Sequence, residues 1–163
     1  MDTYQDSRRP ARRRALSRNE FSARQFGDFD CCHCGRRVSA DARLSGVNHR
    51  NHCPHCLWSR HMDLLAPGDR LCACKGPMPP VGLAFKRAHK KYAPLGPGEL
   101  MLVHRCAACG HLSLTRVAAD DCPAKLWDVF EESLARPPAA PPAAPGIELL
   151  GNEAAEFLRS RLC

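Results

Sequence analysis

The chain from residue 49 reads His49-Arg50-Asn51-His52-Cys53-Pro54-His55-Cys56, and its last four residues form a Cys-x-x-Cys pair. Another pair, Cys31-x-x-Cys34, is followed by Gly35, and 18 residues lie between the two pairs. Two residues between cysteines let both thiolates turn toward one ion, and this distance between pairs is typical of four-cysteine zinc sites. We therefore predict one Zn²⁺ bound by Cys31, Cys34, Cys53 and Cys56. The alternative is that the pairs are coincidental or redox-active.

A third pair, Cys106-x-x-Cys109, needs partners from elsewhere in the chain. Cys74 is the best candidate, because the following Lys75-Gly76 resembles a metal-binding turn. The fourth ligand stays open between Cys72, two residues from Cys74, and His61. His104 ranks behind them, since a histidine beside such a turn more often packs against it. We expect a second Zn²⁺ here, with a disulfide between the third pair as the alternative.

The composition also favours metal. The 163 residues include eleven cysteines, and only 6% are aromatic, so we expect no conventional apolar core of the size usual for this length. Residues 1–25 contain no apolar stretch, and no run of about 18 apolar residues occurs anywhere, which predicts neither a signal peptide nor a membrane span. We therefore expect a cytoplasmic protein, in which thiols stay reduced and bind metal.

Composition divides the chain into zones. Residues 1–25 carry a net charge of +4 and are expected to form a disordered basic arm. Residues 26–122 contain ten cysteines and all eight histidines, with short β-prone pieces, and predict a small α+β zinc-ribbon-like module with short antiparallel strands around two zinc sites. A helix is expected over 123–136, a Pro/Ala linker over 137–146 and a second short helix over 147–163.

Several of these strings resemble the RNHCP-domain family, which is named after Arg50-Asn51-His52-Cys53-Pro54. The resemblance covers residues 26–122 and implies a bacterial-type zinc-binding module without a particular activity. Cys72 is extra to the family pattern, which favours His61 as the fourth ligand of the second site. The other matching strings are Cys31-x-x-Cys34-Gly35, Pro67-Gly68-Asp69-Arg70, Cys74-x-Gly76-x-Met78-x-Pro80, His104-Arg105-Cys106-x-x-Cys109-Gly110 and Asp120-Asp121.

Basic residues recur between the cysteines, and Phe85, Tyr92 and Trp58 lie near them. Cations on a rigid scaffold beside aromatic rings suit phosphate contact and base stacking. We therefore predict RNA binding on a ribosome or another ribonucleoprotein, with DNA or a transcription complex as the second choice. A solvated basic face is the alternative without a partner. The predicted contact residues are Arg12, Arg13, Arg14, Arg50, Arg60, Lys86, Arg87, Lys90, Lys91 and Tyr92.

Other functions are less favoured. His49, Asn51 and His52 suggest an HNH-type nuclease, but they sit within four residues against a cysteine pair, so we expect no enzyme and no small-molecule substrate. A redox or zinc sensor is a further alternative. The C-terminal helices offer a surface for a protein partner, although packing on the zinc module is favoured. Zinc binding lowers the formal charge from +7 to +3 with eight thiolates, or to +4 with seven thiolates and one histidine.

Overall fold

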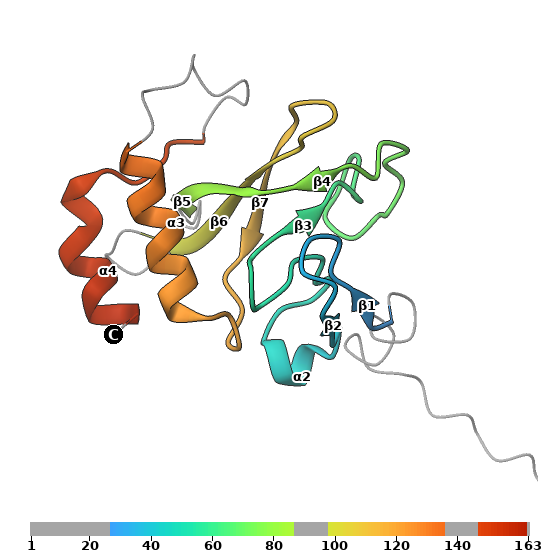
Figure 1. Ribbon diagram of the computed structural model, residues 1–163, viewed down its shortest axis with the longest axis horizontal. Helices are drawn as coiled ribbons and strands as arrows, with labels where there is room; N and C mark the ends of the chain where they lie inside the picture. Colours follow the sequence, from blue (N-terminus) through green and yellow to red (C-terminus); the bar gives the residue numbers. More distant parts are fainter. Residues whose placement is uncertain (1–26, 87–97, 136–146, 163) are drawn as a thin grey trace, which may run out of the picture.

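The computed structural model describes residues 27–86, 98–135 and 147–162, and its first part is built from very short strand pairs. Strands β1 (Phe29–Asp30) and β2 (Arg37–Val38) pair antiparallel, and so do β3 (Ser59–Arg60) and β4 (Pro77–Met78). A four-residue helix, α2 (Ala42–Ser45), follows β2. These elements occupy one side of the molecule (Figure 1).

The larger sheet is an antiparallel meander of three strands, β5 (Pro80–Lys86), β6 (Glu99–Arg105) and β7 (Leu112–Arg116). The β-prone pieces that the sequence indicates correspond to β2, β6 and β7. Strand β5 was not predicted, because Pro80 and Gly82 interrupt its apolar pattern. Central β6 is the most buried strand, from Met101 to His104.

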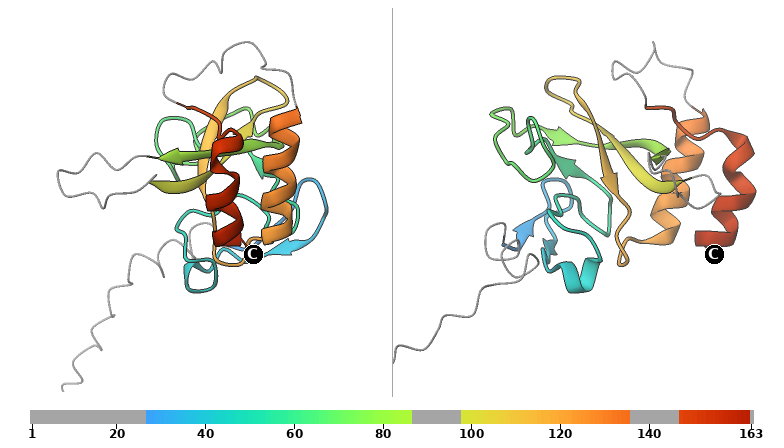
Figure 2. Two further views of the ribbon diagram at one scale, coloured as in Figure 1. Left: turned by 90° about the vertical axis from the view of Figure 1, so that its left-hand side faces the viewer. Right: turned by 180° about the vertical axis from the view of Figure 1, so that it is seen from behind.

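Two helices cover this sheet. Helix α3 (Pro123–Ala135) packs on β5, and α4 (Ala155–Leu162) lies beside α3 after the 3₁₀ turn η1 (Asn152–Ala154). Figure 2 shows both helices at one side of the molecule, opposite the short strand pairs. The residues buried between sheet and helices are Leu57, Leu83, Leu102, Leu126, Val129, Phe130, Ala154 and Leu158.

The structure therefore has an apolar core, although a small one. The few large apolar residues of the chain are concentrated in β5, β6, α3 and α4, where they suffice for one compact cluster. The predicted fold class is confirmed: a small α+β protein with short antiparallel sheets and a C-terminal helix. The basic arm and the Pro/Ala linker lie outside the described residues. Among the described helices, none has the length and apolarity that a membrane crossing requires.

Candidate metal centres

The first metal centre is formed by Cys31, Cys34, Cys53 and Cys56, whose sulfur atoms all lie within 4.8 Å of one another. The Sγ atoms of Cys31 and Cys56 are 3.5 Å apart, and those of Cys34 and Cys53 are 3.7 Å apart. Zinc–sulfur bonds of about 2.3 Å in a tetrahedron place two sulfurs about 3.8 Å apart. The four thiols therefore already have the spacing of a tetrahedral zinc site.

The three Cys-x-x-Cys pairs share one backbone turn. In each, the amide of the first cysteine donates to the carbonyl five residues on, and the first carbonyl accepts from the amide four residues on. This turn points both sulfurs to one side and needs a positive φ at its fifth residue. The closing N–H···O distances are 2.9 Å for Cys31 to Arg36, 2.9 Å for Cys53 to Trp58 and 2.8 Å for Cys106 to His111.

The fifth residue differs in the second pair. Gly35 and Gly110 have φ values of 72° and 76°, whereas Leu57 has 61° although it carries a side chain. A left-handed conformation costs a non-glycine residue about 1–2 kcal/mol. The Leu57 side chain is fully buried in the apolar cluster between sheet and helices. This burial offsets the strain, so Leu57 links the first metal centre to the apolar core.

Backbone amides around the first centre stabilise the thiolate form of some of its cysteines, but not of all four. The amides of His33 and Cys34 lie 3.4 and 3.5 Å from the Cys31 sulfur. A hydrogen bond from the Arg36 amide lowers the pKa of Cys34 to about 7, whereas burial raises the pKa of Cys56. Four adjacent thiolates therefore need a cation to share the site, and a Zn²⁺ ion supplies that charge.

The second metal centre contains His61, Cys74, Cys106 and Cys109, whose ligand atoms also lie within 4.8 Å of one another. The Cys74 and Cys106 sulfurs are 3.7 Å apart, and the Cys109 sulfur is 3.3 Å from His61 Nδ1. The His61 ring stacks on His111, with ring centroids 4.6 Å apart, which fixes its direction.

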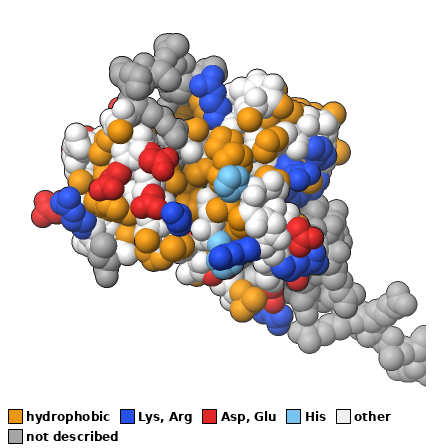
Figure 3. Space-filling view, in the orientation of Figure 1, with side chains coloured by type: hydrophobic (Ala, Val, Ile, Leu, Met, Phe, Trp, Pro, Cys, Tyr) orange, Lys and Arg blue, Asp and Glu red, His pale blue; other side chains and the backbone are white. Residues whose placement is uncertain are grey.

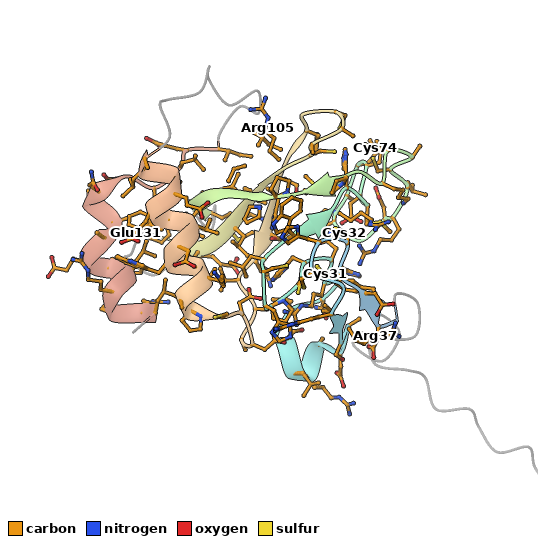
Figure 4. The ribbon with its side chains drawn as sticks, in the orientation of Figure 1. Cys31, Cys32, Arg37, Cys74, Arg105 and Glu131 are labelled. Carbon is orange, nitrogen blue, oxygen red and sulfur yellow. The ribbon has the colours of Figure 1, made fainter. Side chains whose placement is uncertain are left out.

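The ligands of the second centre come from three separate segments. His61 follows β3, Cys74 precedes β4, and the third pair forms the turn between β6 and β7. Figure 4 shows Cys74 near β4, apart from Cys31 and Cys32. A Cβ atom on Gly76 would lie 2.8 Å from the Cys106 sulfur, so only glycine fits beside this centre. The second centre thus joins the loops to the three-stranded sheet.

The other ligand candidates lie outside both clusters. Cys72 is buried but does not belong to either set of ligand atoms. His104 Nε2 is 2.7 Å from the Leu57 carbonyl and its Nδ1 is 3.3 Å from the Thr115 hydroxyl, so both ring nitrogens are engaged. Burial lowers the pKa of His104 to about 4, which keeps the ring neutral. Among the described residues no cysteine pair forms a disulfide.

Cys32 also lies outside the first centre. Its sulfur is directed at the Ser59 carbonyl, 3.4 Å away, and burial raises the pKa of its thiol. Figure 4 shows it on the loop between β1 and β2, beside Cys31. The structure therefore separates the spare thiol from its ligand neighbour.

A buried network of charged and polar side chains lies next to the first centre in the sequence, and no sequence pattern predicted it. His52 Nε2 lies 2.9 Å from Asp121 Oδ1, and Arg50 contacts both Asp120 (2.7 Å) and Asp121 (3.2 Å). Asp121 Oδ2 also accepts the Ala118 amide at 2.7 Å. The side chains of Arg50, His52 and Asp121 are at most 2% exposed. The network ties the residues before Cys53 to the segment before α3.

Arg50 was expected among the nucleic-acid contacts, but the structure buries its side chain. Its guanidinium is buried and neutralised by two carboxylates, so it is not available to a phosphate. Phe85, expected as an exposed aromatic, instead packs edge-on against Phe157, with ring centroids 5.3 Å apart.

The remaining predicted contacts fall into two groups. Arg60 at the end of β3 and Lys86 at the end of β5 are exposed. The others lie outside the described residues. They are Arg12, Arg13, Arg14, Arg87, Lys90, Lys91 and Tyr92.

Both donor sets fit zinc. Four thiolates, or three thiolates and one imidazole, in a tetrahedral arrangement are the ligand sets of structural Zn²⁺ sites. Every position of each tetrahedron is taken by a side chain of this chain. The two clusters are thus consistent with two zinc ions.

Comparison with known proteins gives one match. The model of the RNHCP domain matches residues 26–127, which include all eight ligands and both ends of the buried network. No curated protein and no solved structure matches the chain. The matched segment covers most of the chain, and the chain belongs to the RNHCP-domain family.

Proposed function

We propose that this protein is a structural-zinc RNA-binding module that acts on a ribosome or another ribonucleoprotein. The single observation that carries the proposal is how its charged side chains are engaged. Each of the eight acidic residues between 27 and 122 accepts a hydrogen bond from the protein or forms an ion pair with one of its basic residues. In contrast, Arg36, Arg60 and Lys75 form no ion pair with a described residue.

The engaged acids explain why these cations stay unpaired. Asp69, for example, accepts the amides of Leu64, Leu65, Ala66 and Leu71 at 2.8–3.0 Å, and these bonds hold its pKa well below the usual range. Its charge therefore organises a loop. Phosphate groups are the natural partners for cations that the protein leaves unmatched.

The charge of the molecule also supports RNA binding. Figure 3 shows a group of acidic side chains over the helices on the left, and several basic side chains with some acidic ones among them on the right. With seven thiolates and two Zn²⁺ bound, the formal charge of the chain falls from +7 to +4 and stays positive. A chain that keeps a net positive charge attracts the negatively charged backbone of RNA.

The metal centres themselves favour a non-catalytic role. Four protein ligands fill a tetrahedral zinc and leave no position for a reactive water. His52, which a nuclease would need to activate water, is buried against Asp121. Both observations favour a scaffold over an enzyme.

The proposal is tested with zinc-loaded full-length protein and fluorescein-labelled single-stranded RNA, double-stranded RNA and single-stranded DNA. We expect anisotropy titrations to give the tightest binding for RNA, with affinity that falls as salt rises. A pull-down from a cell extract, with and without RNase, then identifies the ribonucleoprotein. RNase-independent capture of proteins alone, without RNA binding in the titration, would contradict the proposal.

A charge-matched pair of variants locates the contact. Neutralising Arg87, Lys90 and Lys91 to Gln should reduce the slope of log K against log salt by about 2, since each phosphate contact contributes about 0.7. Neutralising Lys125, Arg159 and Arg161, which lie on α3 and α4, removes the same charge and should leave the slope unchanged. An equal loss in both triple variants would mean that only net charge matters.

A further inference from the structure

A cavity of about 570 Å³ opens between the loop after β1, strand β3 and the segment that leads to Lys75. Its size falls within the range of about 300–1,000 Å³ that small ligands occupy. The Cys31 and Cys32 side of its wall is labelled in Figure 4. Neither the zinc ligation nor the buried network accounts for this space.

Two cations on the wall of the cavity keep their charge. Arg60 is exposed and has no carboxylate partner among the described residues. Lys75 Nζ donates to the Arg70 carbonyl at 2.8 Å, a bond that orients the ammonium without neutralising it. The acid on the wall, Asp30, is 3.4 Å from the Arg37 guanidinium. The wall therefore offers two positive charges to an anion.

An apolar surface faces the same space. Phe29, Trp58 and Met62 line the cavity together with the two cations. The Trp58 ring is held by a parallel stack with His33, with ring centroids 4.0 Å apart and planes within 4° of each other. A fixed indole beside cations suits a flat aromatic group that carries a phosphate, as a nucleotide does.

Asn51 supplies the group that can read a base. Its carbonyl accepts a hydrogen bond from the Ser59 hydroxyl at 3.0 Å, which fixes the backbone. Asn51 lines the cavity, and its carboxamide has no hydrogen bond to any described residue. An asparagine side chain presents one acceptor and two donors, which match the edge of an unpaired base.

We infer that this cavity holds one nucleotide of single-stranded RNA. The base lies against Trp58, its edge meets the Asn51 carboxamide, and its phosphate meets Arg60 and Lys75. This inference rests on the proposed function and deepens it, because it names an unpaired nucleotide as the recognised unit.

The fluorescence of Trp58 tests this inference directly, because a base stacked on the indole should quench it. In a zinc-loaded Trp127→Phe background Trp58 is the single tryptophan, since the chain has two. Titrants are AMP, GMP, CMP, UMP, ribose 5-phosphate and inorganic phosphate, and the labelled single-stranded RNA serves in parallel. We expect saturable quenching by nucleotides, weaker effects of the two titrants without a base, and competition between nucleotides and RNA.

Variants separate the two contacts. Arg60→Gln should weaken all four nucleotides about tenfold, because it removes a charge-assisted bond to phosphate. Asn51→Ala should instead change the ratio of affinities between bases about fivefold. Arg105→Gln, on an exposed residue that Figure 4 shows apart from Cys31 and Cys32, is the matched control and should change neither. Zinc content of two ions per chain confirms that each variant is folded.

The outcomes distinguish the inference from the proposed function. If RNA binds, nucleotides do not quench or compete, and Arg60→Gln behaves as Arg105→Gln does, the cavity assignment is wrong and RNA binding stands. If inorganic phosphate competes as well as nucleotides do, the cavity is an anion site and the assignment is wrong. If neither RNA nor nucleotides bind, both fail. If nucleotides bind and RNA does not, the site serves free nucleotides, which overturns the RNA assignment.

Discussion

The two sides of the molecule are stabilised in different ways. The metal-binding half, residues 27–78, buries only a few apolar side chains, among them Cys31, Val38 and Cys53, around its first centre. The helix–sheet half, made of β5–β7, α3, η1 and α4, has an apolar cluster that includes Phe130 and needs no ion. Strands of two residues suffice in the first half because the metal ligands fix the turns between them.

Three of the contacts between the halves explain why they form one module. Leu57 reaches from the second cysteine pair into the apolar cluster. Asp121 holds Arg50 and His52 just before α3, and the Cys122 amide donates to the Pro54 carbonyl at 3.0 Å. The second metal centre joins loops of the metal-binding half to the turn between β6 and β7.

Removal of zinc should have the largest effect, because it should unfold the metal-binding half and leave the helix–sheet half folded. Structural zinc contributes about 10–16 kcal/mol of apparent binding energy, so chelation should unfold residues 27–78. The helix–sheet half should keep most of its helical circular dichroism and its slow amide exchange. Hydrogen exchange resolved by segment, before and after chelation, is the measurement. Equal loss of protection in α3 and α4 would contradict the comparison.

Phe130→Ala should act on the opposite half. Deletion of this fully buried ring should cost about 3–5 kcal/mol of unfolding free energy. Two zinc ions per chain should remain bound in the native variant, because Phe130 belongs to the apolar cluster and not to either metal centre. The measurements are denaturant unfolding, followed by α-helical circular dichroism, and metal analysis. Release of zinc from the folded variant would show that the halves are not separable.

Asp121→Asn should weaken the junction between the halves. The variant leaves the buried Arg50 without one of its two carboxylates and His52 without its carboxylate partner, which should cost about 3 kcal/mol. Asp120→Asn is the matched control, since the Asp120 side chain is 40% exposed and its loss should cost much less. Chemical unfolding of both variants measures the difference, and similar losses would argue against a buried junction.

Gly76→Ala should have the smallest effect and should sharpen the comparison between the two centres. The added methyl group would meet the Cys106 and Cys74 sulfurs at 2.8 and 3.3 Å. We expect about a 10- to 100-fold loss of zinc affinity at the second centre and none at the first. Competition with a chelator should then release one ion early and one late. Loss of both ions together would mean that the centres are coupled.

The sequence predicted the metal ligands better than the residues that hold the metal-binding half against the rest of the protein. Ligand spacing is local, so Cys31, Cys34, Cys53 and Cys56 could be grouped from their pattern alone. The choice of His61 over Cys72 needed the family resemblance and depends on how β3 and β4 pair.

No local sequence pattern indicated the contacts that hold the two halves together. Asp121 meets His52 across 69 residues, and no spacing rule links an aspartate to a distant histidine. Leu57 occupies a turn position that favours glycine, so its role depends on the core it reaches. The apolar cluster was missed for a related reason: whole-chain composition averages over segments, while α3 and β6 concentrate the few large apolar residues.

The order of the eight ligands along the chain has a consequence for synthesis. All ligands of the first centre, residues 31–56, precede all ligands of the second, residues 61–109, so the sets do not interleave. A chain that emerges from the ribosome N-terminus first exposes a complete first set before the last pair has been translated. The first ion can therefore be captured with fewer competing thiols present, and the second closes the protein only after β5 and β6 have been made.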